Sequence, residues 1–273
     1  MRPFTAGALI LLAVLGTGCG TAGPPPSTAA VTPGPAPATS STRAPEPSSA
    51  PATTAAKPSQ QPSGPRERLV GGRYQPLWPF SGPEEAAAWQ RAHRADGREA
   101  WRLDAGRTAI AFSRDFLGFS EIDRAVRTVP AGRHARVHVG FHAEEGSRPL
   151  VAAVVHLMRY GQGPDAPWEV VGTDDTTLSL TQPAYGAEIG SPVTVGGRVT
   201  GVDESIRVQV GRPGADRPLA QRCCLSAGGE DAPWSARLPI PARPGRTLTI
   251  VASTGGHVAQ VERFAVTGVT SPS

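Results

Sequence analysis

The sequence predicts two folded parts, an α+β domain over residues 76–176 and an all-β sandwich over residues 177–269. Helical apolar patterns between residues 83 and 117 give way to alternating apolar and polar residues from position 133 on, which is typical of helices followed by an antiparallel sheet. After position 177, short alternating runs separated by Gly and Pro carry no helical period. Such runs are typical of a sandwich.

Two helices are predicted at the start of the α+β domain. The first is expected from Pro83 to about His93, with Ser81 as its capping residue and proline and two acids in its first turn. The second is expected from Asp104, as the cap, to about Leu117, and Gly118 ends it.

The strands of this domain follow the helices. Residues 133–142 alternate between apolar and polar side chains, residues 150–160 are apolar on both faces, and residues 168–171 form a third, short run. The pattern predicts an antiparallel sheet with both helices on one of its faces. Two helices followed by long strands ending in W-E-V-V loosely resemble the nuclear-transport-factor-2-like and cystatin-like folds over residues 76–172.

The second part is divided into short β-type runs. They are Thr177–Leu180, Val193–Val199, Ile206–Val210, Trp234–Leu238, Leu248–Ser253 and Val258–Val266. The pattern P-x-x-G-x-x-I-x-S-P-V-x-V-x-G at residues 183–197 resembles the immunoglobulin-like domain found at the C-termini of bacterial spore-germination-associated proteins and many actinobacterial lipoproteins. This resemblance covers about residues 178–268. It implies a β-sandwich in an exported envelope protein, and it implies no reaction.

The N-terminus has the layout of an export signal. Residues 1–18 contain Arg2, a short apolar run and small residues, and the run is about half of the roughly 20 residues that a membrane span needs. The following Cys19 makes the segment resemble a lipoprotein signal, although Gly16 stands where that pattern prefers Leu. Lipidation at Cys19 is expected, with ordinary secretion as the alternative. The resemblance implies an anchor on the outer face of the cytoplasmic membrane.

A disordered tether is predicted over residues 19–75. The segment consists largely of Pro, Ala, Ser, Thr and Gly. It therefore cannot bury enough apolar surface to offset the entropy of ordering.

Charge argues against a nucleic-acid partner. The chain has 27 Lys and Arg against 23 Asp and Glu, a net charge of +4. The basic residues are scattered among acids, whereas nucleic-acid binders cluster them on one face.

The other cysteines, Cys223 and Cys224, are neighbours in the sequence. Export permits a disulfide, and a bond between the two at a strand end is the preferred interpretation. Two free thiols and an intermolecular bridge are the alternatives.

Four tryptophans fall in the α+β domain, and they form either an aromatic core or the lining of a ligand pocket. They are Trp78, Trp89, Trp101 and Trp168.

Histidines are the remaining candidates for chemistry. The strand predicted at residues 133–142 places His134, His138 and His142 on one face, and His138 and His156 are expected to approach each other across a hairpin. Zinc needs a third or fourth ligand, and none is evident, so no metal or cofactor is expected. The sequence shows no nucleophile elbow and no phosphate-binding loop.

These observations predict a non-enzymatic, lipid-anchored envelope protein that acts as a binding or scaffold module. Its expected partners are the membrane, through the lipid, and an envelope ligand or protein that the sequence does not identify. The alternative is an envelope enzyme or a metal-dependent sensor that uses the histidines of the α+β domain. The two domains are expected to be rigidly joined, because residues 172–176 are too few for independent motion.

Overall fold

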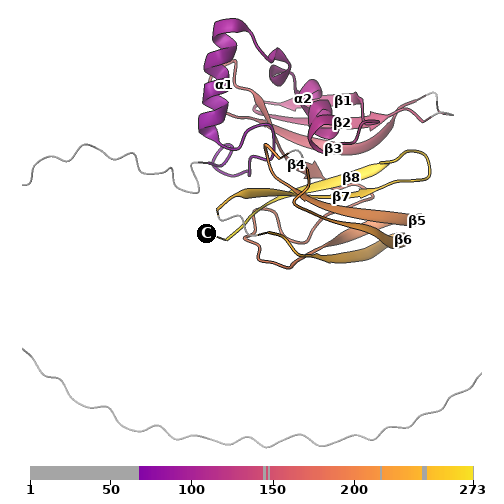
Figure 1. The fold of residues 1–273 in the computed structure, drawn as a ribbon. Coiled ribbons are helices and arrows are strands. Elements are labelled where there is room, and N and C mark those ends of the chain that lie inside the picture. Colours follow the sequence, from indigo (N-terminus) through magenta and orange to yellow (C-terminus); the bar gives the residue numbers. More distant parts are fainter. Residues whose placement is uncertain (1–67, 144–145, 147, 216, 242–244, 273) are drawn as a thin grey trace, which may run out of the picture. The chain divides into compact units, whose positions relative to one another are not determined.

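Two antiparallel four-stranded sheets and two short α-helices make up the described part of the chain (Figure 1). The computed structural model describes residues 68–272, except 144, 145, 147, 216 and 242–244. These residues belong to one compact unit. Cys19, the predicted signal and most of the predicted tether lie outside the described residues. The folded part begins earlier than expected, because Val70 is fully buried and forms an antiparallel bridge with Tyr74.

The first sheet has the order β1-β2-β3-β4. Its strands are β1 (Arg124–Ala131), β2 (His134–Phe141), β3 (Leu150–Arg159) and β4 (Trp168–Asp174). The last three match the predicted strands closely. Strand β1 was not predicted, because this edge strand is largely exposed and therefore lacks the apolar alternation by which a half-buried strand is recognised.

The helices begin and end close to the predicted positions. They are α1 (Pro83–Asp96) and α2 (Ala105–Ala111), and α2 continues into a π-helical turn, Phe112–Phe116. Asp104 caps α2 as predicted, since its carboxylate accepts a hydrogen bond from the Arg107 amide. Ser81 does not cap α1. Gly82 occupies the capping position, and the Ser81 hydroxyl donates to Glu85 instead. None of the described helices is long and apolar enough to cross a membrane.

The two helices do not share one face of the sheet, and this expectation was wrong. Phe112 of the α2 region packs in a core with Leu157. Trp89 of α1 packs in a separate core with Met158 and Val171. Neighbouring strand residues such as Leu157 and Met158 point to opposite faces. Because β3 is apolar on both faces, each face needs a cover, and the two helices supply one each.

The second sheet has the order β6-β5-β7-β8. Its strands are β5 (Val193–Gly211), β6 (Ala220–Leu238), β7 (Thr247–Thr254) and β8 (Arg263–Thr270). Two runs predicted as separate strands, 193–199 and 206–210, are halves of the single strand β5. Glycine-containing irregularities near Gly201 bend this strand without ending it. The run predicted at 258–266 starts later, at Arg263, and the run predicted at 177–180 forms only the bridge Leu178–Val199.

Strand β4 and the chain before α1 connect the two sheets. The Leu77 amide donates to the Val170 carbonyl at 3.0 Å, and the Val170 amide donates to the Trp78 carbonyl at 2.7 Å. Farther along β4, the Thr173 hydroxyl accepts a hydrogen bond from the Val266 amide of β8 at 2.8 Å. Figure 1 shows β4 and β8 side by side. Val251, Phe264 and Val266 of the second sheet belong to the same apolar core as the β2–β4 residues, so the two sheets share a core.

We predict that limited digestion with proteinase K removes the N-terminal segment and leaves one fragment that begins close to Arg68. The junction at residues 172–176 should resist cleavage, because Thr173 is hydrogen-bonded to β8 and Leu178 is fully buried. The measurement is intact mass spectrometry over a digestion time course. Early cleavage within residues 172–176 would show a hinged joint and contradict the prediction.

Candidate functional site

A groove of about 580 Å³ lies beside the end of β4 and along β8. Five chemically distinctive side chains line it, namely Tyr74, His156, Asp174, Asp175 and Tyr185. Most of the other lining residues are small or apolar, among them Gly172, Ala184 and Ala265. Gly172 adopts a φ of 151°, a conformation that favours glycine. The missing side chain at Gly172 leaves room beside the Tyr185 ring.

Local backbone contacts hold the two tyrosines in place. Tyr74 ends the short turn closed by the Val70–Tyr74 bridge. The Tyr185 hydroxyl accepts a hydrogen bond from the Gln75 amide at 2.7 Å. The Tyr74 and Tyr185 ring centroids are 6.3 Å apart in an edge-to-face arrangement. The two rings therefore form a fixed aromatic corner of the groove.

Two histidines, His134 and His156, pack against Tyr74 of this corner. His134 Nδ1 and His156 Nε2 are 2.9 Å apart, and the two rings are stacked with centroids 5.2 Å apart. The Tyr74 ring lies nearly perpendicular to both, with its centroid 5.8 Å from that of His134 and 5.1 Å from that of His156. Burial first of all, and then the charges of Arg136 and His134, lower the pKa of His156 to about 4. His156 is therefore neutral at pH 7, and in its hydrogen bond with His134 one ring nitrogen donates and the other accepts.

The acidic side of the groove is only partly neutralised. Arg136 Nε lies 2.7 and 2.6 Å from the two carboxylate oxygens of Asp174. Both side chains of this pair are partly exposed, and such pairs contribute little to stability. Asp175 is exposed at the rim. Two carboxylates beside two tyrosine rings favour a positively charged group, because aromatic faces also attract cations.

The four tryptophans considered as the lining of a ligand pocket are buried or partly buried. Trp89 and Trp168 are only 6% and 5% exposed and belong to different cores. Trp78 and Trp101 are partly buried and stack on each other, with ring centroids 5.7 Å apart. None of the four tryptophans lines a groove described here. Of the two interpretations given by the sequence, the aromatic core fits these positions.

The structure pairs His156 with a different histidine from the one expected. In the β2–β3 ladder His156 lies opposite Arg136, so His134 and His138 occupy the two diagonal positions, and His134 makes the contact. His138 lies opposite Val154. Within the described ranges of the chain, no three His, Cys, Asp or Glu residues are grouped so that they could hold a metal ion.

The predicted pair Cys223 and Cys224 forms a disulfide on β6. Both residues are exposed and line a second cleft, of about 450 Å³. This cleft is separate from the groove that carries Tyr185.

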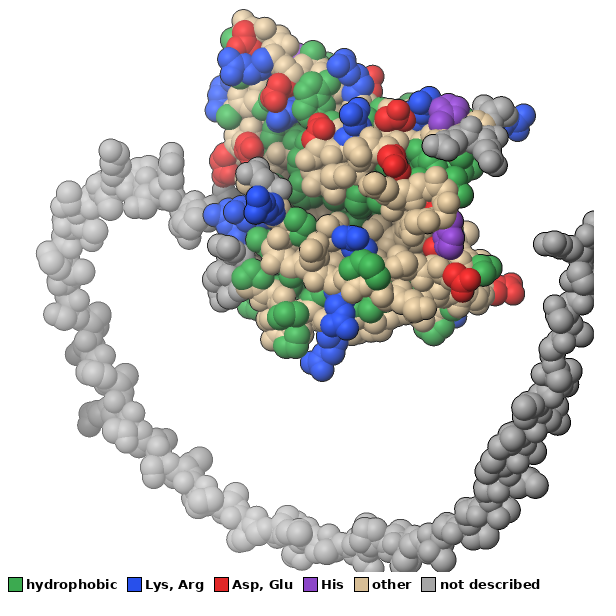
Figure 2. Space-filling view, turned by 45° about the vertical axis from the view of Figure 1, so that its right-hand side comes forward, with side chains coloured by type: hydrophobic (Ala, Val, Ile, Leu, Met, Phe, Trp, Pro, Cys, Tyr) green, Lys and Arg blue, Asp and Glu red, His purple; other side chains and the backbone are tan. Residues whose placement is uncertain are grey.

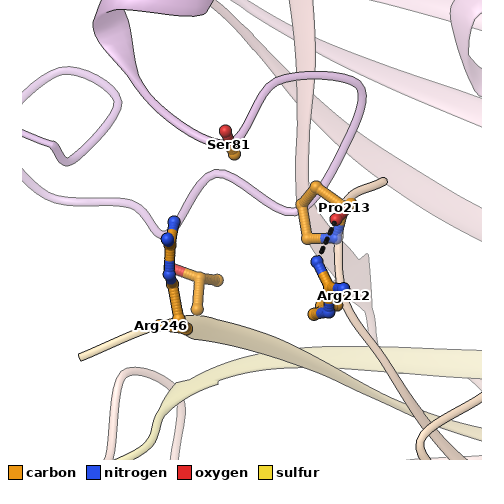
Figure 3. A pocket seen from close by; sticks show the side chains of 5 residues that line it. Ser81, Arg212, Pro213 and Arg246 are labelled. Carbon is orange, nitrogen blue, oxygen red and sulfur yellow. Dashed lines mark hydrogen bonds between the residues drawn. The ribbon is translucent and has the colours of Figure 1, made fainter. Parts of the chain in front are cut away.

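A smaller pocket of about 280 Å³ carries two arginines, Arg212 and Arg246. Figure 3 shows Arg246 extending toward the chain segment before α1, while Arg212 turns back to the Pro213 carbonyl, to which it donates at 3.4 Å. The Ser81 hydroxyl donates a hydrogen bond to the Glu85 carboxylate. Because these polar groups do not converge, this pocket is a weaker candidate for an anion site. On the face seen in Figure 2, basic and acidic side chains are interspersed.

Sequence reasoning missed both tyrosines of the groove. Tyr74 falls in the segment assigned to the tether, and Tyr185 lies far away in the sequence, within the motif P-A-Y-G. The only local signal was a large aromatic residue in a turn-forming sequence, which is a weak indication of a binding surface.

Comparisons with known protein families, with curated proteins and with solved structures found no match to this chain.

We predict that His156 makes the protein sensitive to mild acid. As the pH falls from about 6.5 toward 4, the unfolded chain protonates this histidine while the folded chain resists protonation, so stability falls. Relative to His156→Gln, the wild type should lose about 2 kcal/mol of unfolding free energy between pH 7 and pH 4.5. Urea denaturation at a series of pH values measures this difference.

The matched control is His142→Gln, since His142 is exposed at the end of the same hairpin. It should keep the wild type's loss of unfolding free energy between pH 7 and pH 4.5, because it leaves His156 in place. Parallel pH profiles for the wild type and His156→Gln would show that burial does not lower the pKa of His156.

Proposed function

We propose that the protein is a lipid-anchored cell-envelope binding module, and that its groove receives a cationic group next to an apolar surface. The observation that carries this proposal is the aromatic corner of Tyr74 and Tyr185 beside the carboxylates of Asp174 and Asp175. Concave sites with mostly apolar walls and a few convergent polar groups are the usual form of ligand sites. A basic side chain of an envelope protein or a small amine has the matching chemistry.

The electrostatics of the histidine pair favour binding over catalysis. An imidazole with a pKa of about 4 is a weak base at pH 7, whereas general bases operate best with a pKa near the working pH. A neutral His156 also adds no positive charge that would repel a cation in the groove. These properties support a binding module over the enzyme or metal-sensor alternative.

The proposed location rests on the N-terminal sequence. The export-type signal, Cys19 and the Pro-rich segment after it supply an anchor and a spacer for the folded part. In this proposal the folded part stands on the outer face of the cytoplasmic membrane.

We further propose that the second sheet and its flanking segments form an immunoglobulin-like sandwich. Three features support this: β6 pairs along both halves of β5 whereas β7 pairs only with the second half, Leu178 bridges to Val199, and Glu188 forms a parallel bridge to Thr270. The two helices followed by the β1–β4 meander support a nuclear-transport-factor-2-like or cystatin-like origin for the first part.

Tyramine is the probe that tests the groove, because it joins an aromatic ring to an ammonium group. In two-dimensional NMR it should shift the amide signals of Gly172, Asp175 and Tyr185 at millimolar concentration. Phenylacetate, which has the opposite charge, should not. Replacing Asp175 with Asn should weaken tyramine binding about threefold to tenfold, because an exposed attraction contributes about 1 kcal/mol.

The matched control is Asp123→Asn, because Asp123 precedes β1 and does not line the groove. It should bind tyramine like the wild type. Equal binding of tyramine and phenylacetate, or no shift of the groove amides up to the solubility limit, would refute the proposed ligand chemistry.

The anchor is tested separately. Mass spectrometry of the mature protein should find a lipid-modified N-terminal Cys19, and Cys19→Ala should release the protein into the medium. An unmodified N-terminus elsewhere in residues 16–30 would establish ordinary secretion and leave the groove proposal untouched.

A further inference from the structure

We propose that the Cys223–Cys224 disulfide is a thiol–disulfide exchange site, which a dithiol reductant opens and thereby reshapes the adjoining cleft. The site is distinct from the tyrosine groove and does not depend on the ligand proposed there. Four features of the disulfide support the proposal: its position in the chain, its exposure, its place in the strand ladder and the basic residue opposite it.

The bond contributes little to the stability of the fold as a cross-link. A disulfide stabilises a fold chiefly by closing a loop of the unfolded chain, and the effect grows with the length of that loop. Cys223 and Cys224 have a sequence separation of one, so their bond closes essentially no loop. A cross-link with so little structural effect is more readily explained by its chemistry.

A reductant can reach the bond. Both cysteines are exposed and line the cleft of about 450 Å³. One wall of the cleft comes from β5, with Arg207 and Gln209, and another comes from the start of the β7–β8 turn, with Gly255. Exposed disulfides are the ones that exchange readily, because the attacking thiolate must approach a sulfur atom directly.

The strand ladder is irregular at the bond. Ile206 pairs with Leu225 and Val208 pairs with Arg222, so the single residue Arg207 on β5 faces two residues, the cysteines, on β6. Such bulges locally release a strand from regular pairing and frequently occur at functional sites. The chain at the cysteines can therefore change conformation without breaking a regular ladder.

Arg207 provides a positive charge near the disulfide. It lies opposite the cysteine pair and lines the same cleft. A neighbouring guanidinium favours a thiolate over a thiol, and a better-stabilised leaving thiolate speeds exchange. Arg207 is therefore placed to assist the step in which the disulfide opens.

The reaction is a two-electron exchange. One thiolate of a dithiol attacks the sulfur of one cysteine, the bond between the cysteines breaks, and the other cysteine leaves as a thiolate. The second thiol of the reductant, once deprotonated, attacks the mixed disulfide. This releases the oxidised reductant as a disulfide and leaves both cysteines reduced. In an extended strand, neighbouring side chains point to opposite faces, so one thiol can then leave the cleft.

Dithiothreitol under native conditions is the test. The purified protein should first show no free thiol, by alkylation and intact mass. Dithiothreitol should then allow iodoacetamide to modify both cysteines far faster than the protein unfolds globally. Hydrogen exchange at Ser253 and Gly255 should change on reduction, since these residues share the cleft wall.

Two variants separate the proposed role from a structural one. Arg207→Gln should slow reduction about threefold to tenfold, whereas Arg237→Gln, exposed on the other half of β6, should not. The double variant Cys223→Ser with Cys224→Ser should stay folded, with a Tm within about 3 °C of the wild type.

Four results would each overturn the proposal, the last of them by refuting the change in the cleft. The first is a protein that carries free thiols as purified from an oxidising compartment. The second is reduction that proceeds only as fast as global unfolding. The third is a large loss of Tm in the double serine variant, which would show that the bond is structural. Unchanged hydrogen exchange on reduction would refute the reshaping of the cleft.

Discussion

The backbone edge of β4 is the constraint on which the rest of the structure depends. In the first sheet β4 is an outer strand, and its free amides and carbonyls lie inside the molecule, where unpaired backbone groups are costly. Leu77 and Trp78 pair with Val170, and farther on the Thr173 hydroxyl bonds to Val266 of β8. The second contact uses the Thr173 side chain in place of backbone pairing, and the end of β4 and the adjacent part of β8 line the groove.

Glu169 completes the pairing at the other end of β4. A ladder along this edge cannot continue past Trp78, because the next residue, Pro79, has no amide hydrogen. The Phe80 amide that follows instead donates to the Glu169 carboxylate at 3.1 Å. Glu169 is fully buried, and burial raises its pKa well above the usual value. Burying an acid costs free energy. Here the buried Glu169 side chain provides the acceptor for the Phe80 amide, which Pro79 separates from the strand pairing.

Local signals in the sequence predicted local structure well, and contacts between distant residues were not predictable. Asp104 was recognisable as a cap because Ncap chemistry depends on its immediate neighbours. The exposed strand β1 and the first half of β6 carry no apolar alternation, so no periodicity indicated them. The adjacency of Cys223 and Cys224 was visible in the sequence, whereas the cleft beside them depends on the packing of distant segments. Tyr74 and Tyr185 meet because Gln75, next to Tyr74, donates its amide to the Tyr185 hydroxyl and accepts a hydrogen bond from Thr247 of β7.

The β7–β8 hairpin keeps the groove and the cleft apart. Ala265 and Val266 of β8 line the groove, while Ser253 and Gly255, at and just after the end of β7, line the cleft. The hairpin between them is buried on both faces, since Ile250 packs in the second core while Val251 packs in the core shared with the first sheet. Close packing on both sides resists sliding or tilting of the hairpin. Coupling between two sites needs an element with two arrangements, and the burial of the hairpin on both faces opposes such a rearrangement of its central part.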